Sequence, residues 1–138
     1  MRHVAFYVPG EPKAQPRPRA FARGGKARVY NPHTSNEWKA RVAIAAAKHF
    51  AADPIGKSLA MQLNFRLPRP RSHFGKDGLK PSAPVLPTGK PDIDNLAKAV
   101  IDALVGVGVL DDDCLVCLLT VTKRYADVNP GCDIEMSW

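Results

Sequence analysis

Proline is the residue that most restricts how this chain can fold, because its thirteen copies are unevenly distributed. Ten of them fall within residues 9–18 and 68–91. Proline lacks a backbone N–H and fixes φ, so neither segment can form the interior of a helix or a central strand. We therefore predict loops over residues 11–25 and 68–91. The second loop is long and basic, and we expect it to be mobile without a partner.

Hydrophobic periodicity predicts regular structure in the remaining stretches. The clearest alternation places Leu59, Met61, Leu63 and Phe65 on one face of a strand. The predicted strands span residues 2–8, 27–30, 58–67, 114–123 and 133–137, and the predicted helices span residues 35–52 and 92–105. A length of 138 residues suits one domain. We expect a single α+β domain over residues 1–138, with a small mixed β-sheet and two main helices packed on it.

Several classes of protein are excluded by the same reading. No apolar stretch reaches the roughly 18 residues that a membrane-spanning helix needs. The N-terminal apolar segment runs into Pro9 and Gly10 too early for a secretory signal, so we expect a cytoplasmic protein. Three cysteines, Cys114, Cys117 and Cys132, are an odd number and favour free thiols. Cys114 and Cys117 have zinc-knuckle spacing, but no second pair follows them.

Charge is divided along the chain in a way that the net value of +7 conceals. Residues 1–48 hold ten Lys/Arg against two acids, and residues 49–91 hold seven against two. Residues 92–138 hold three against nine. A metal-dependent nuclease needs both parts, cations for the DNA phosphates and carboxylates for a divalent metal. A plain DNA-binding protein needs only the cations, and an ordinary solvated surface explains either charge run.

The pattern of residues 92–105, at the start of the acidic part, predicts an amphipathic helix. Leu96, Val100, Ala103 and Leu104 recur at helical spacing and form its buried stripe. Asp94, Lys98 and Asp102 step by four residues along another face, and Asp92 lies at the helix entrance. Three consecutive aspartates, Asp111, Asp112 and Asp113, follow this helix. We expect that turn to bring another carboxylate beside Asp92 and Asp94.

Each of these residues also has a purely structural interpretation. Asp92 or Asp94 can cap the helix and complement its dipole. Lys98 can be a solvated partner of Asp94, and Asp102 a surface partner of Lys98. The aspartate triplet can be a simple turn that uses side-chain to backbone hydrogen bonds.

The assembly of these pieces in one basic chain resembles the RusA-type Holliday junction resolvases, which are small phage-associated endonucleases. The resemblance rests on Pro91-Asp92-Ile93-Asp94-Asn95-Leu96-Ala97-Lys98, on Asp102-Ala103-Leu104 and on Asp112-Asp113. It extends upstream to Gly10-Glu11-Pro12, Arg17-Pro18-Arg19 and Val29-Tyr30. Leu115 departs from the pattern, because the family often has glutamine there. The triple aspartate leaves the register of the later pair open by one residue.

This resemblance implies a RusA-like, homodimeric fold and a set of site residues. Asp92, Asp94 and Asp113 would bind Mg²⁺, or Mn²⁺ in its place, with Asp112 replacing Asp113 if the register shifts by one. Lys98 would assist catalysis. A divalent ion held by carboxylates can activate water and offset charge on the phosphate, which agrees with this assignment. The resemblance also implies the cytoplasm of a bacterial or phage-infected host cell.

The predicted activity is Mg²⁺-dependent, structure-selective cleavage of four-way DNA junctions by paired symmetric nicks, in recombination or repair. Each chain offers one acidic cluster, so two symmetric cuts favour a twofold homodimer that supplies two sites. We expect no membrane partner and no small-molecule cofactor. The candidate DNA-binding residues are Arg17, Arg19, Arg23, Arg69 and Arg71. The alternatives are a non-catalytic basic DNA-binding protein and a related nuclease that acts on flaps or forks.

Overall fold

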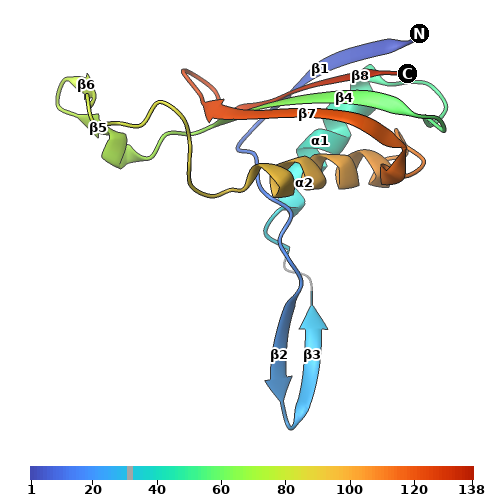
Figure 1. Ribbon diagram of the computed structural model, residues 1–138, viewed down its shortest axis with the longest axis horizontal. Coiled ribbons are helices and arrows are strands. Elements are labelled where there is room, and N and C mark those ends of the chain that lie inside the picture. Colours follow the sequence, from blue (N-terminus) through green and yellow to red (C-terminus); the bar gives the residue numbers. More distant parts are fainter. Residues whose placement is uncertain (31–32) are drawn as a thin grey trace.

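A four-stranded sheet forms the centre of the computed structural model, which describes residues 1–30 and 33–138 (Figure 1). Its strands lie in the order β1 (His3–Pro9), β8 (Gly131–Ser137), β4 (Leu59–Leu67) and β7 (Val116–Tyr125). β8 pairs antiparallel with both β1 and β4, whereas β4 and β7 are parallel. The sheet is therefore mixed, as the sequence predicted.

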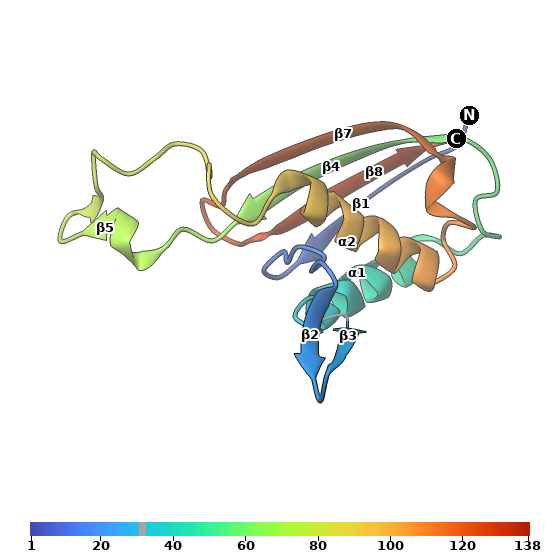
Figure 2. The same ribbon diagram turned by 60° about the horizontal axis from the view of Figure 1, so that its bottom comes forward.

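Two helices, α1 (Asn36–His49) and α2 (Ile93–Gly106), cover one face of this sheet (Figures 1 and 2). The predicted stripe of α2 is buried along its whole length, and in α1 the residues Trp38, Val42, Ala45 and Ala46, which recur at helical spacing, are buried as well. The predicted face of β4 meets them, with Leu63 and Phe65 fully buried. The α+β arrangement is thus confirmed, and its core follows from these three local patterns. Among the described residues, no helix is both long enough and apolar enough to cross a membrane.

A β-hairpin made of β2 (Arg19–Arg23) and β3 (Lys26–Tyr30) projects away from the sheet and helices (Figure 1). The predicted strand over residues 27–30 is confirmed, but the prediction of loop over residues 11–25 is wrong for β2. The prolines of that segment all precede Arg19, so nothing prevents strand pairing beyond it. Gly24 and Gly25 both have positive φ, at 60° and 77°, which suits the tight turn of a two-residue hairpin.

Residues 68–91, hereafter the arm, form the second projection (Figure 2). The arm is mostly irregular, as predicted, but it contains a short 3-10 turn, η1 (Arg71–His73). A minimal hairpin of β5 (Phe74–Gly75) and β6 (Gly78–Leu79) follows that turn. The arm connects β4 to α2, so its base lies at the start of α2.

We predict that Leu104→Ala lowers the free energy of unfolding by about 2–5 kcal/mol, because Leu104 on α2 is fully buried and its truncation leaves a cavity. Urea denaturation monitored by circular dichroism measures this loss. Ile44→Ala on α1 is the matched control, since Ile44 is 58% exposed. Equal losses for the two variants would contradict the core described here.

Candidate active site

The first turn of α2 carries two exposed carboxylates. Asp92 occupies the N-cap position, but its side chain makes no capping hydrogen bond. The Oδ1 atom of Asp94 accepts a hydrogen bond from the N–H of Asn95 at 2.9 Å. The capping interpretation therefore does not account for the Asp92 carboxylate, which is left available for a ligand.

Lys98 and Asp102 lie further along the exposed face of α2. The Nζ atom of Lys98 is 3.7 Å from Oδ1 of Asp102, an i,i+4 ion pair. The Lys98 side chain is 56% exposed, so this pair contributes only tenths of a kcal/mol. Lys98 lies one helical turn from Asp94, and so weak a pairing leaves its ammonium group free to bind another anionic group.

The aspartate triplet lies beyond the other end of α2. Asp113 begins a 3-10 turn, η2 (Asp113–Leu115), so the strand predicted from residue 114 begins instead at Val116. Oδ1 of Asp112 caps this turn by accepting the N–H of Cys114 at 3.1 Å. That hydrogen bond lowers the pKa of the Asp112 carboxyl. Asp112 therefore has the structural role that a turn assigns to aspartate.

The length of α2 separates the two acidic groups. Fourteen residues of α-helix span about 21 Å, with Asp92 before the first residue and Asp113 past the last (Figure 2). Over residues 1–30 and 33–138, no three His, Cys, Asp or Glu side chains gather closely enough to hold a metal ion. The expectation that the triplet lies beside Asp92 and Asp94 is therefore wrong within one chain, because the buried face of α2 holds its ends apart.

All three cysteines are free thiols, as predicted. Cys114 and Cys117 are exposed, and the absence of a metal-binding group among the described residues argues against the zinc alternative. The pKa of the Cys114 thiol is raised, first of all by its hydrogen bond to Asp112. Burial raises the pKa of the Cys132 thiol. Neither of these two thiols is an activated nucleophile.

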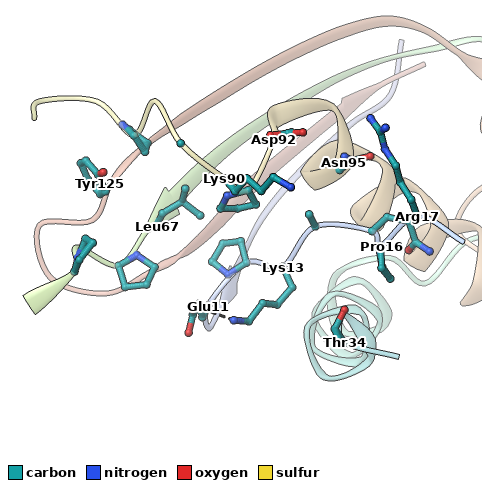
Figure 3. Close-up of a pocket in the computed structure, with 18 of the residues that line it drawn as sticks. Glu11, Lys13, Pro16, Arg17, Thr34, Leu67, Lys90, Asp92, Asn95 and Tyr125 are labelled. Atoms are coloured by element: carbon teal, nitrogen blue, oxygen red, sulfur yellow. Dashed lines mark hydrogen bonds and ion pairs between the residues drawn. The ribbon is translucent and has the colours of Figure 1, made fainter. Parts of the chain in front are cut away.

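A cleft of about 930 Å³ opens beside the start of α2 (Figure 3). Residues 11–18 form one wall, and the two ends of the arm form another. Asp92 and Asn95 reach it from α2, and Tyr125 reaches it from the end of β7. The backbone N–H of Gln15 donates to the carbonyl of Asn95 at 2.8 Å, which holds the N-terminal wall against the helix.

Comparison with known proteins identifies the family of this chain. Residues 9–137 match the family described as "Endodeoxyribonuclease RusA". The chain belongs to the RusA endodeoxyribonuclease family. A protein of Bacillus subtilis (strain 168) named "Uncharacterized protein YqaN" is 36% identical over 127 residues, which cover 90% of this chain and 89% of that protein.

The RusA match covers both basic projections, and the structure separates the five candidate arginines within them. Arg17 lines the cleft and is exposed, Arg23 lies exposed at the end of β2, and Arg71 is exposed on the arm. The backbone of Arg19 lies in β2, but its side chain is outside what the structure describes.

Arg69 makes contacts that set it apart from Arg17, Arg23 and Arg71 in this RusA-family chain. Its guanidinium carbon lies 4.3 Å from the centre of the Tyr125 ring. The same group donates to the carbonyl of Pro84 at 2.7 Å. Arg69 therefore ties the two sides of the arm to β7, and we assign it a positioning role.

Sequence reasoning missed several residues that line the cleft, among them Lys13, Gln15, Lys90 and Tyr125. The prolines near Lys13 and Lys90 marked both segments as loops, which is a signal that exposed functional side chains often share. Tyr125 lay just beyond the predicted strand of residues 114–123. Only the folded chain brings these segments together.

We predict that Arg69→Ala loosens the arm. Loss of a hydrogen bond from a charged donor costs about 1.5 kcal/mol, so amides protected by arm closure should exchange about tenfold faster. The amides of Lys80 and Ala83 report this, because both donate to carbonyls within the arm. Hydrogen exchange measured by mass spectrometry is the test, with Arg71→Ala as control. Equal exchange in the two variants would remove the positioning role.

Proposed function

We propose that this chain is a Mg²⁺-dependent endonuclease that resolves four-way DNA junctions by paired symmetric nicks in recombination and repair. The observation that carries the proposal is the first turn of α2, where Asp92 and Asp94 are exposed between two basic projections in a RusA-family chain. Carboxylates that can bind a metal ion, flanked by cations that can bind phosphates, suit the cleavage of a polyanionic strand.

The two projections supply the positive charge that DNA binding requires. Residues 16–30 contain five Lys/Arg and no acid, and the arm contains five against the single acid Asp77. Both helices pack against the sheet, so neither is displayed as a recognition helix for the major groove (Figure 2). This arrangement favours recognition of DNA shape and phosphate positions over base sequence.

The carboxylates of Asp92 and Asp94 fit a hard divalent cation. Mg²⁺ prefers oxygen ligands and is bound through one or two carboxylates, and Mn²⁺ accepts the same donors. When bound, such an ion activates water and offsets negative charge at the phosphate. Lys98 would add a second positive charge from the same helix face, where it can stabilise the developing charge on the phosphate oxygens.

The third carboxylate comes, in this proposal, from a second copy of the chain. We assign that role to Asp113 and not Asp112, because Asp112 is engaged in capping η2. A homodimer also supplies the two sites that paired cuts require. The separation of Asp113 from Asp92 within one chain then becomes a reason for dimerisation.

The edge strand β7 offers the surface for this dimer. Among the strands that the structure describes, it pairs only with β4, and Leu118 and Leu119 are exposed at 69% and 46%. A long exposed apolar edge strand is a template for strand pairing. Antiparallel pairing of two β7 strands about a twofold axis sets the start of each strand beside the end of the other.

That pairing carries Asp113 of the partner subunit towards the start of α2. The Nζ atom of Lys123, near the end of β7, donates to the carbonyls of Gly89 and Pro91 at 2.7 and 2.9 Å. The end of β7 thus lies next to Asp92. A twofold axis between the exposed Leu118 and Leu119 sets Asp113 of the partner subunit opposite Arg124, because both residues lie equally far from the axis in sequence.

We predict that the protein makes paired symmetric nicks in a labelled four-way junction with Mg²⁺, and none with EDTA. Asp94→Asn should reduce the rate by about 100-fold or more, because it removes charge that stabilises the metal and the transition state. Asp53→Asn, at an exposed carboxylate in the loop between α1 and β4, should cut normally. Binding without cleavage under any metal would favour a DNA-binding protein, and preferred cleavage of forks or flaps would favour a related nuclease.

A mixing experiment tests the shared site. Asp94→Asn and Asp113→Asn are each expected to be inactive, but subunit exchange between them creates heterodimers with one intact site. Single nicks should then return at about a quarter of the wild-type rate, since half of the dimers are mixed and each has one site of two. If both carboxylates act within one chain, the mixture stays inactive. Asp94→Asn mixed with itself is the matched control.

A further inference from the structure

The walls of the cleft combine many prolines with polar side chains. Seven of its nineteen lining residues are prolines, and Leu67 and Tyr125 add further apolar surface. Proline loses no rotamer freedom when a ligand packs against it, so such walls need little ordering. A volume of about 930 Å³ is within the range of clefts that enclose a small organic group. These properties suit a flat, partly apolar ligand.

Three cationic side chains line the same cleft. Arg17 and Lys90 face the cleft, and neither has an ion-pair partner among the described residues (Figure 3). Lys13 also lines it, although its Nζ atom donates to Glu11 at 3.1 Å. An anionic group is therefore expected on either side of the apolar part of the ligand.

Two carboxamide side chains lie where the N-terminal wall meets α2. Gln15 and Asn95 are joined through the backbone hydrogen bond described above, and both line the cleft. The Oε1 atom of Gln15 is buried and finds no hydrogen-bond donor in the described part of the chain. A buried acceptor without a donor is costly, so it marks a place where a ligand N–H would be stabilised. Carboxamides present the donor and acceptor pair that base edges require.

We propose that the cleft binds one unpaired nucleotide of the DNA strand, next to the phosphodiester that is cut at Asp92 and Asp94. The base lies between the proline walls and presents its edge to Gln15 and Asn95. Lys90 and Arg17 bind the phosphates on either side of it. This inference rests on the proposed junction cleavage and adds a substrate element to that same site.

The cleft explains how a basic protein can avoid cutting ordinary duplex DNA. A base must leave its stack and its pair to enter, and this costs least where pairing is already interrupted. Continuous stacking is broken where strands exchange at a four-way junction, so a base leaves its neighbours there at lower cost than in a continuous duplex. Selectivity for structure then arises at the cutting site itself and not only from the two projections.

Fluorescence of 2-aminopurine tests the proposal without any turnover. The base analogue is placed in turn at each position flanking the mapped cut in a four-way junction, and the protein is added in EDTA. We expect a several-fold rise at one position next to the cut and no rise in matched duplex. Gln15→Ala and Lys90→Ala should reduce that rise, whereas Lys48→Ala, at an exposed lysine on α1, should preserve it.

Three outcomes would overturn the proposal. A junction that is bound in EDTA and cut with Mg²⁺, yet shows no rise at any position, would remove the nucleotide cleft and leave the nuclease intact. If the rise is as large in Gln15→Ala and Lys90→Ala as it is in Lys48→Ala, the unstacked base lies elsewhere. A protein that neither binds nor cuts the junction would overturn the proposed function, and the cleft proposal with it. Circular dichroism of each variant separates these results from loss of fold.

Discussion

The burial of α2 against the sheet determines where every candidate group of the active site lies. Leu96, Val100 and Leu104 are fully buried along this helix, and each contributes about 1.5–3 kcal/mol through removal from water. Such a stripe fixes both the direction of the helix and its rotation about its own axis. Asp94 and Lys98 consequently face outwards, and Asp92 is held at the edge of the cleft.

The start of α2 is also where the two basic projections meet the body of the protein. Residues 11–18 lead into the hairpin, and the arm returns to the sheet at residues 87–91, so both bases line the same cleft. Cations from distant parts of the sequence, such as Lys13 and Arg17, thus line the same cleft as Asp92. In the proposed function, a DNA strand held by either projection passes close to Asp92, so that binding and cleavage occur at one place.

Patterns that depend on neighbouring residues could be predicted from the sequence, and those that depend on distant segments could not. The alternation in β4 and the stripes of α1 and α2 reflect local periodicity, and the structure confirms them. The structural role of Arg69 could not be predicted, because its contact with Tyr125 joins residues 56 positions apart in the sequence. The position of Asp113 depends on the direction in which α2 packs, and the cleft on the approach of residues 11–18 to Asn95.

The arm is an insertion within the crossover from β4 to the parallel strand β7, and it lies outside the packed core (Figure 1). The entropy of closing a loop rises only slowly with its length. The arm can therefore be lengthened, shortened or exchanged without moving α2 or the sheet. If the arm contacts DNA as proposed, it can vary in evolution while α2, which positions the carboxylates, stays constant. Relatives with arms of different sizes would then share one cutting chemistry and differ in the DNA structures they accept.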